Sequence, residues 1–293
     1  MVHTHIAHPR FVDLLPGLTA AVSFSVTDIL LKLVYADGMD VLSLVTLRGV
    51  LVVAFFWVWL RVQKPRVWHS PRQRVIALVL GLLFAAVMFG LLLAVSLLPV
   101  SIAILAYFIY PLLTGIGAAL TGVERLGWKA LLTALAAFAG LALMLGVDFA
   151  TLSTMGIACA FGAAICRVVS LLATRAYLGG ADARVTTWYS LLPSGAIFLV
   201  ASLVVGVWHL PQTHVGWLAF LGISFGSTLS TLLIYISTNT VGPFRTALVM
   251  NLEPLLTALL SMVLLGEMMS HLQMLGAAIM ISALCIFQFV RGR

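Results

Sequence analysis

Ten strongly apolar stretches, each about as long as one membrane crossing, occupy most of this chain. A helix rises 1.5 Å per residue, so about 20 apolar residues cross the hydrocarbon layer of a bilayer. Charged residues make up only 9% of the chain, against about 25% in a soluble domain. The sequence therefore predicts an all-α membrane protein with ten transmembrane helices. We expect these helices near Leu14–Val34, Val41–Leu60, Val75–Leu98, Ile102–Thr121, Trp128–Val147, Met155–Ala176, Thr186–Val207, Gly216–Ser237, Phe244–Leu265 and Leu272–Val290.

The last five stretches repeat the first five. Residues 110–114 read YPLLT and residues 253–257 read EPLLT, so the second copy lies 143 residues after the first. Other small and polar residues recur at nearly the same offset, which extends the duplication over almost the whole chain. We therefore expect two five-helix repeats, residues 1–148 and 149–293.

The same offset relates two acids, Glu124 and Glu267. Each lies at a predicted helix end, and the two are on opposite faces of the membrane. We expect them to cap helices or to pair with nearby loops. A role in transport is the alternative.

Lys and Arg lie almost entirely on one side of the predicted membrane. If the N-terminus is cytosolic, 13 of the 16 basic residues face the cytosol and the outer loops hold none. Because positively charged loops stay on the cytosolic side, both termini are predicted to be cytosolic. Each repeat has five helices, which is an odd number, so the second repeat enters the membrane inverted relative to the first. The 13 residues are Arg10, Arg61, Lys64, Arg66, Arg72, Arg74, Arg125, Lys129, Arg175, Arg184, Arg245, Arg291 and Arg293.

The net charge of +7 suits anionic lipid headgroups and not nucleic acid, because the basic residues are spread along one membrane face. The three cysteines lie inside predicted spans, a distribution that indicates neither disulfides nor zinc. His3, His5 and His8 lie in a short polar tail with no fold to hold a metal. We expect a small-molecule substrate and the lipid bilayer as partners, with no nucleic acid, metal or cofactor.

Gly222, Ser224 and Gly226 match the G-x-S-x-G pattern of a hydrolase nucleophile. That pattern requires a strand that turns sharply into a helix, whereas here it falls inside a predicted membrane helix. Two glycines at i and i+4 favour close helix packing instead. We therefore predict packing at this segment, and the chain is not expected to be an enzyme.

Ionisable residues inside membrane spans are costly to insert and so indicate function. Asp28 and Arg48 each lie roughly 9–12 Å below the outer surface by residue count. At equal depth their side chains can meet, and we predict a structural ion pair between them. The alternative is that they bind substrate or a proton. Lys32, four residues after Asp28, either pairs with it or extends to the interface.

Arg167 and Glu253 form a second candidate pair, about 8 and 14 Å from the cytosolic surface by residue count. In the duplicated register Arg167 stands where Asp28 does, and Glu253 stands where Tyr110 does. We predict that Arg167 binds a substrate carboxylate, or neutralises Glu253 until substrate or a proton arrives. A permanent internal ion pair is the alternative.

Pro111 and Pro254 occupy equivalent positions inside two predicted spans. Each removes a backbone hydrogen bond and is predicted to kink its helix. The residues that share a face with each proline are predicted to line a cavity, with helix packing as the alternative. They are Tyr107, Tyr110 and Thr114 in the first repeat and Met250, Glu253 and Thr257 in the second.

Further polar and aromatic groups lie near the same depth. Phe24 and Tyr235 join the tyrosines as aromatic groups that could stack on an apolar or aromatic substrate. Hydroxyl groups are unusually dense in the eighth span, where they either line the cavity or bond back to their own helix. They belong to Ser227, Thr228, Ser230 and Thr231.

Residues 252–256 (LEPLL) followed by 264–267 (LLGE), and residues 110–111 (YP) followed by 122–126 (GVERL), resemble the EamA-type repeats of the drug/metabolite transporter superfamily. The resemblance covers essentially the whole chain. It implies a ten-helix carrier of the bacterial inner membrane, with a central cavity between two inverted halves. Many such carriers export amino acids or related metabolites. This chain departs from the family in reading SFS at residues 23–25, where members often have a Trp-Gly pair, and in Asp28.

We therefore predict a secondary transporter that works by alternating access and can act as a monomer, exporting an amino acid, aromatic or otherwise, or a related metabolite. No nucleotide-binding loop is present, so we expect proton exchange through Glu253 or Asp28, or facilitated diffusion. An importer of a nucleotide-like, vitamin-like or cationic drug-like compound is the alternative, and an intramembrane enzyme or receptor is a remote one. The predicted substrate-binding residues are Phe24, Asp28, Tyr107, Tyr110, Arg167, Tyr235, Met250 and Glu253.

Overall fold

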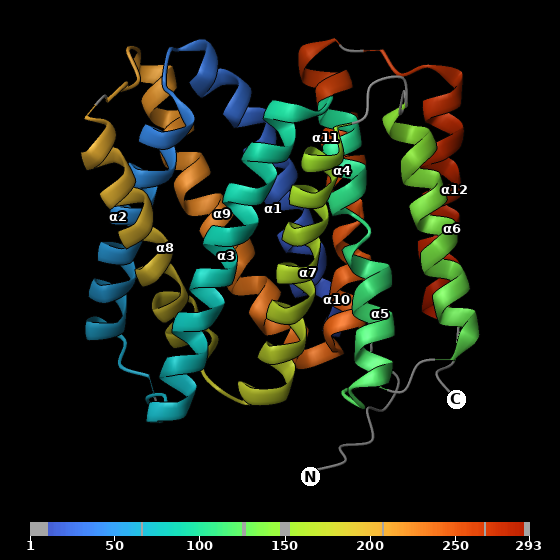
Figure 1. Ribbon diagram of the computed structural model, residues 1–293, viewed down its shortest axis with the longest axis horizontal. Coiled ribbons are helices and arrows are strands. Elements are labelled where there is room, and N and C mark those ends of the chain that lie inside the picture. The colour runs from blue at the N-terminus through green and yellow to red at the C-terminus, as the bar shows by residue number, and fades with distance from the viewer. Residues whose placement is uncertain are drawn as a thin grey trace.

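The computed structural model describes residues 11–65, 67–124, 127–146, 153–206, 208–266 and 268–289, and these fold into helices joined by short turns (Figure 1). The prediction of an all-α membrane protein is confirmed. The helices are α1 (Phe11–Ala36), α2 (Val41–Val62), α3 (Pro71–Leu97), α4 (Val100–Tyr107), α5 (Tyr110–Leu120), α6 (Trp128–Leu145), α7 (Thr154–Tyr177), α8 (Ala183–Val205), α9 (His214–Val241), α10 (Pro243–Met250), α11 (Leu252–Leu265) and α12 (His271–Phe289).

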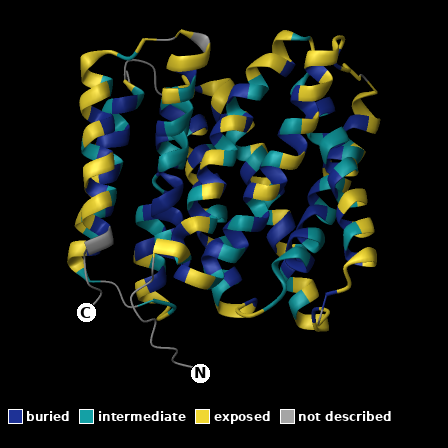
Figure 2. Ribbon diagram, turned by 180° about the vertical axis from the view of Figure 1, so that it is seen from behind, coloured by how far each residue is buried: buried dark blue, intermediate teal, exposed yellow. Residues whose placement is uncertain are grey.

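The helices account for the ten predicted spans. Among the described residues, nine spans are long and apolar enough to cross a bilayer, and α12 is a shorter apolar helix. Two of the nine are each built from two short helices, α4 with α5 and α10 with α11. The outward surfaces are apolar: Phe89 is 65% exposed and Val200 60% exposed, and exposed residues line the outside of the bundle in Figure 2. Such a surface suits lipid as the solvent.

The two composite spans break where the sequence places its prolines. The break follows Tyr107 in the fourth span and Met250 in the ninth. Pro111 is the second residue of α5, and Pro254 is the third residue of α11. Because proline has no N–H, the carbonyl four residues before it loses its helical partner, here Tyr107 and Met250. Both helices are therefore interrupted within a few residues of the prolines, at the places where the sequence predicts kinks.

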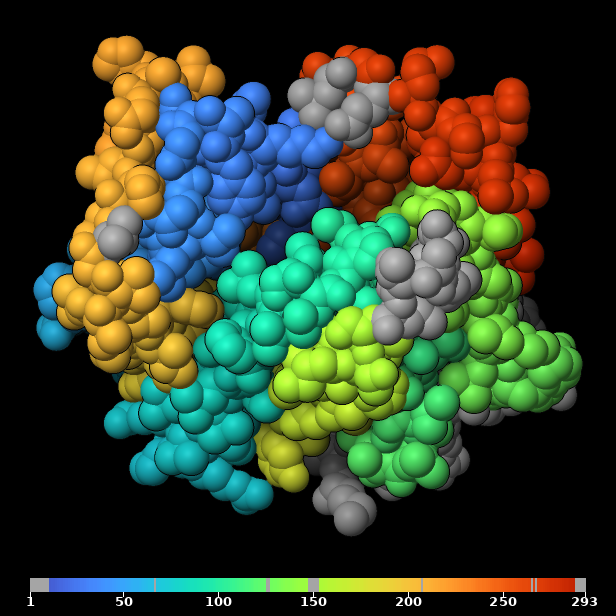
Figure 3. Space-filling model, turned by 45° about the horizontal axis from the view of Figure 1, so that its top comes forward, coloured from blue at the N-terminus to red at the C-terminus, as the bar shows by residue number. Residues whose placement is uncertain are grey.

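Helix pairing follows the duplication. α1 packs along α9, and the equivalent pair in the inverted register, α7 and α3, packs in the same way. Likewise α1 contacts α11 and α7 contacts α5. Figure 3 shows the segments of the two repeats interleaved, with α3 beside α7 and α2 beside α8. The contacts therefore define two bundles that each draw on both repeats: the first bundle is α1 with α9, α10 and α11, and the second bundle is α7 with α3, α4 and α5.

Equivalent polar groups hold the two ends of the neighbouring helices α2 and α8. Asp40 accepts a backbone hydrogen bond at the start of α2 (3.0 Å), and Asp182 does so at the start of α8 (2.9 Å). At each end, a histidine from an adjacent loop also contacts one of the two helices or its capping residue. His209 Nδ1 lies 3.1 Å from Asp40 Oδ2, and His69 Nε2 lies 2.8 Å from Thr186 Oγ1. Each end of the α2–α8 pair is therefore held by a related set of contacts.

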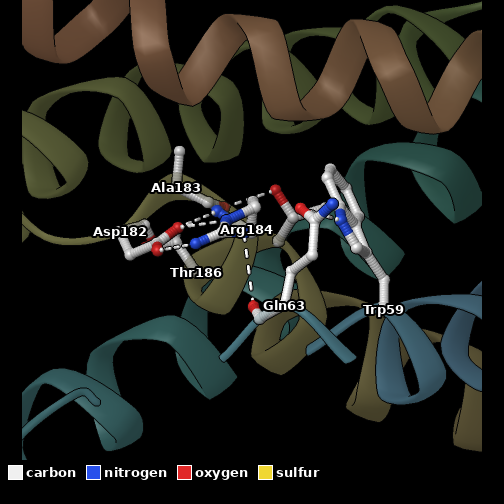
Figure 4. A network of polar contacts seen from close by, with 7 residues as sticks. Trp59, Gln63, Asp182, Ala183, Arg184 and Thr186 are labelled. Atoms are coloured by element: carbon white, nitrogen blue, oxygen red, sulfur yellow. Dashed lines mark hydrogen bonds and ion pairs between the residues drawn. The ribbon is translucent and has the colours of Figure 1, made fainter. Parts of the chain in front are cut away.

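The group at the start of α8 also binds the end of α2 (Figure 4). Arg184 Nη2 lies 2.7 Å from Asp182 Oδ2, and its Nη1 donates to the backbone carbonyl of Gln63 (3.4 Å). Arg61, Lys64, Arg72 and Arg74 lie in or near the α2–α3 connection. We call this end of the molecule the basic end, and the end at which α1 leads into α2 the opposite end.

Glycines allow the closest helix contacts. A Cβ on Gly222 or Gly226 of α9 would lie 2.7 Å from side-chain atoms of Leu30 or Thr27 on α1. The hydroxyl of Ser224 between them is buried and donates to the carbonyl of Phe220 on its own helix (2.7 Å). The prediction that this segment serves helix packing is confirmed.

α6 and α12 pack in the same manner at one side of the molecule (Figure 1). A Cβ on Gly140 would lie 2.7 Å from the carbonyl oxygen of Gly276 and 2.7 Å from the backbone nitrogen of Met280. Since backbone atoms cannot rotate away, the two helices would have to separate.

The variant Gly140→Ala is therefore expected to lower the thermal unfolding midpoint in detergent, at a cost of about 1–3 kcal/mol typical of overpacking. Gly162→Ala on α7 is the matched control, because nothing lies within 4 Å of the added Cβ. The control should be neutral or slightly stabilising, since alanine favours helix more than glycine does. Equal midpoints for the two variants would contradict this account of the α6–α12 contact.

Candidate functional site

The centre of the molecule holds a partly buried cation, Arg167 on α7. Its neighbours Ala164, Val168 and Leu171 belong to the main apolar core, so the helix face that carries Arg167 turns inward. The guanidinium carbon lies 5.9 Å from the centre of the Tyr110 ring, within cation–π range. Its Nε is buried and has no hydrogen-bond partner within the described chain. Arg167 therefore keeps a donor free for a group that the chain does not supply.

Three aromatic rings form one wall beside Arg167. The break between α4 and α5 brings together Tyr107, Phe108 and Tyr110, with ring centres 5.2 Å apart for Tyr107 and Tyr110 and 5.7 Å for Phe108 and Tyr110. Tyr110 is only 2% exposed. The charge of Arg167 interacts with both tyrosine hydroxyls. An interrupted helix thus presents aromatic and hydroxyl groups at one point near the cation.

A small pocket lies between α3, α7 and α9, lined by Arg167 and Tyr235 among other residues. The space open to water in it is about 20 Å³, enough for about one water molecule. Ser170, Thr174 and Thr231 also line it, but their hydroxyls donate to carbonyls of their own helices. Arg167 and Tyr235 therefore carry its distinctive polar chemistry.

Most hydroxyls of the predicted eighth span, which is α9, bond back to their own helix, the second of the two alternatives given above. Ser227, Thr228 and Thr231 donate to the carbonyl four residues earlier, at 2.6, 2.7 and 2.9 Å. Ser230 also reaches across to the carbonyl of Ala20 on α1 (3.0 Å). These hydroxyls therefore form hydrogen bonds within α9 and, through Ser230, between α9 and α1.

Two carboxyl groups approach the site from the first bundle. Thr257 on α11 donates to Asp28 Oδ2 on α1 (2.8 Å), and Glu253 lies one turn before Thr257 on α11. The charge of Glu253 interacts with those of Asp28 and Arg167. Yet the side chains of Arg167 and Glu253 do not approach within the 4.0 Å of an ion pair. The two charges therefore interact at longer range, without the permanent ion pair that was the alternative.

The predicted ion pair between Asp28 and Arg48 is wrong. Asp28 turns toward α11, where Thr257 is its partner, while Arg48 donates to Ser227 on α9 (3.2 Å). The two residues have equal depth, but their helices point them at different neighbours. Depth follows from residue counting, whereas the rotation of a helix about its axis follows from packing.

The other predicted site residues lie around this centre. Met250 is 1% exposed and belongs to the main apolar core. Phe24 and Tyr107 are partly buried against the same core. Lys32 on the first span donates to Ser261 (3.4 Å), one turn beyond the Asp28–Thr257 contact. Sequence reasoning did not single out Ser261 or Ser227 as partners, because small hydroxyl residues are common in these helices.

Glu124 lies outside the spans, just after α5, and its carboxylate packs against Gly242 at the start of α10, in the other repeat. The guanidinium groups of Arg175 and Arg245 attract this carboxylate, but its Oε1 is buried and has no hydrogen-bond partner in the described chain. Burial dominates and raises the pKa of Glu124 to about 7. Glu267, its predicted counterpart, lies outside the described residues. The structure therefore does not show Glu124 as a hydrogen-bonding cap, and places it instead between two arginines at the start of α10.

Nine membrane-spanning segments and a shorter apolar helix among the described residues, arranged in two repeats, are the architecture of a multi-pass membrane transporter. The model of the EamA-like transporter family matches residues 13–146 and again residues 154–288, so the chain belongs to this family. A solved structure described only as "Crystal structure of protein" is similar in fold, with a TM-score of 0.79 and 20% sequence identity over 95% of this chain and 96% of that one. No curated protein matches the chain.

The raised pKa of Glu124 has a measurable consequence. The folded state binds this proton more tightly than the unfolded state, whose pKa is 4.5. The carboxyl therefore contributes stability that is full below pH 4.5 and is lost as the pH rises to about 7. Glu124→Gln should thus unfold at a higher temperature than the native protein at pH 8, and this advantage should shrink by on the order of 3 kcal/mol toward pH 4.

The measurement is the thermal unfolding midpoint of both proteins in detergent at pH 4, 6 and 8. Glu253→Gln serves to separate Glu124 from the acids of the central site. A difference between Glu124→Gln and the native protein that does not change with pH would contradict the assignment.

Proposed function

We propose that this protein is a secondary transporter that exports a zwitterionic metabolite, an amino acid or a close relative, from the cytoplasm across a bacterial inner membrane. One observation carries the proposal: a cation on the second bundle interacts with the charge of Glu253 on the first, and Glu253 in turn interacts with Asp28. Arg167 belongs to α7, whereas Asp28 and Glu253 belong to α1 and α11. A bound amino acid would place its carboxylate at Arg167 and its ammonium group at Asp28 or Glu253.

The unpaired Nε–H donor of Arg167 supports this assignment. Its buried Nε lacks a partner in the described chain, and an unsatisfied buried donor costs about 1–3 kcal/mol. A guanidinium and a carboxylate form two parallel hydrogen bonds, so a substrate carboxylate is the natural partner. Tyr107, Tyr110 and Tyr235 near this position favour substrates with an apolar or aromatic side chain.

Transport follows from rocking the first bundle against the second. The pocket beside Arg167 has room for about one water molecule, so it must widen before a metabolite fits. The groups that hold opposite charge lie on opposite bundles, and each bundle contains helices of both repeats. Separation of the bundles at one end would open the site to that end while the other stays packed, which is alternating access.

Proton exchange through Glu253 or Asp28 is the proposed driving force for export. Two carboxylates near each other in a low-dielectric region are costly unless a cation or a proton neutralises them. Arg167, the substrate ammonium group and a proton can each meet this need. Substrate and proton would then compete for the same carboxyls, which couples the two fluxes. The basic end would face the cytoplasm, together with both termini.

The two carboxyls also support a second candidate, the transport of a cationic drug-like compound. Such a compound would use Asp28 and Glu253 and would not need Arg167. Transport of the same compounds into the cell would make the protein an importer. The response of transport to changes at Arg167 distinguishes the zwitterion from the cation.

In proteoliposomes tested with a panel of labelled amino acids, Arg167→Ala should weaken the apparent affinity of the transported compound by about 10- to 100-fold, the loss expected for charge-assisted hydrogen bonds. Arg167→Lys should recover part of this loss, since it restores the charge without the planar fork. Arg72→Ala, which removes an exposed arginine at the basic end, should transport normally. Unchanged affinity in Arg167→Ala would exclude the carboxylate assignment.

Glu253→Gln should make transport independent of an imposed pH gradient, because the amide cannot carry the exchanged proton. Flux is measured in proteoliposomes with and without the gradient, and Glu124→Gln serves as the control with an acid removed outside the central site. Retention of the full gradient dependence in Glu253→Gln would remove this carboxyl from the coupling mechanism.

A further inference from the structure

A second hollow lies far from the central site, on the surface where α2 and α8 run side by side (Figure 1). It is a groove of about 490 Å³, lined by both helices. Its floor is narrow because Gly49 and Gly195 bring the backbones together, with 3.2 Å between a Cβ added to Gly49 and the Cα of Gly195. Apolar side chains form the walls. The lining comprises Gly49, Val50, Val53, Ala54, Trp57, Trp188, Leu192, Gly195, Ala196 and Leu199.

The groove has the length and depth of one lipid tail. From Gly49 to Trp57 the helix rises about 12 Å, close to half of the roughly 30 Å hydrocarbon layer. Gly49 lies near the middle of α2, and Trp57 lies toward its basic end. On the antiparallel α8, Trp188 lies near the start, at the same end. The groove thus runs from the middle of the membrane to the surface at the basic end.

The groove continues into a positively charged rim. Positions 49, 53 and 57 recur every four residues on one face of α2, and Arg61 is the next in that series. Its guanidinium carbon lies 5.3 Å from the centre of the Trp57 ring. Lys64 follows, and both basic residues are exposed. Neither forms an ion pair with any residue that the structure describes. Asp182, at the same end of α8, already forms an ion pair with Arg184 (Figure 4).

An unused hydrogen-bond donor lies at the junction of groove and rim. The indole Nε1 of Trp188 is buried and has no acceptor in the described chain. The ring contacts that of Trp68, with centres 6.5 Å apart in an edge-to-face arrangement. Tryptophan favours the depth at which tails meet headgroups, where the ester oxygens of a phospholipid offer acceptors.

We propose that this groove binds one anionic phospholipid from the leaflet at the basic end. One acyl chain would lie along Val53, Ala54 and Ala196, the esters would lie at the level of Trp188, and the phosphate headgroup would contact Arg61 and Lys64. A zwitterionic lipid fits the same apolar groove but carries an ammonium group that the two cations repel. The site therefore selects by headgroup charge.

A bound lipid is also expected to affect the stability of the α2–α8 pair. The ends of α2 and α8 at this site are joined through Arg184 and the Gln63 carbonyl. A lipid that lies across both helices is expected to hold them together and so to raise the thermal stability of the protein.

The test is native mass spectrometry of the full chain released from detergent with equimolar phosphatidylglycerol and phosphatidylcholine of identical acyl chains. The native protein should retain one phosphatidylglycerol in preference to phosphatidylcholine. Arg61→Gln/Lys64→Gln should lose this preference by about fivefold for each charge removed. The control Arg72→Gln/Lys129→Gln removes the same charge from exposed positions at the same end. This variant should keep the preference for phosphatidylglycerol.

A second variant pair tests the groove itself. Ala54→Leu/Ala196→Leu fills it at two exposed positions and should abolish retention of the lipid, whereas Ala278→Leu, exposed on α12, should not. Equal retention of both lipids by the native protein, or unchanged retention in the filled variant, would overturn the proposal. So would a dimer mass that the filled variant converts to monomer, because a second copy would then be the occupant.

Discussion

The burial of one guanidinium at membrane depth is the constraint on which the centre of this protein depends. A charged side chain there costs at least about 2.5–3.5 kcal/mol on insertion scales, and Arg167 persists because several elements compensate it. Tyr110 offers its ring face, the charge of Glu253 attracts the guanidinium, and the neutral hydroxyl groups of Tyr107 and Tyr235 lie near it. These groups come from α4, α5, α9 and α11, so the helices must keep their relative positions for the cation to be tolerated.

The duplication supplies a symmetric scaffold, and the site departs from that symmetry. The breaks before Pro111 and Pro254 recur in both repeats, and α4 and α10 have equal length. Yet the equivalent positions carry Tyr110 in one repeat and Glu253 in the other, and Asp28 in one where Arg167 stands in the other. Because the bundles exchange helices between repeats, these differences place a cation opposite two carboxyls. A symmetric fold thereby gains a site with two distinct ends.

Much of the fold was predictable from the sequence, because it depends on one-dimensional patterns. The ten spans follow from apolar length, the two breaks from proline, and a closely packed face of α9 from Gly222 and Gly226, although its partner α1 did not follow. The partners of polar side chains did not follow. Asp28 binds Thr257 and not Arg48, since the rotation of α1 is set by its packing on α9 and α11.

Glu124 illustrates the same limit. Its place at a helix end indicated a capping role or a nearby loop as partner, but its carboxylate packs against Gly242 and interacts with Arg245, more than 110 residues later in the chain. Similarly, the related contacts of His69 and His209 at the two ends of α2 and α8 join residues far apart in the chain. Only the packing of the repeats brings such residues together.

In the proposed transporter, Arg167 and the carboxyls of Glu253 and Asp28 recognise both charges of one substrate. The most direct test is a competition measurement on purified protein, in which an amino acid that it binds is displaced by the unlabelled amino acid, its decarboxylated amine and its deaminated acid. Both analogues should compete at least about tenfold more weakly than the amino acid, because each lacks one charge-assisted contact. Equal competition by the amine, or binding of no amino acid in the panel, would contradict this recognition of both charges.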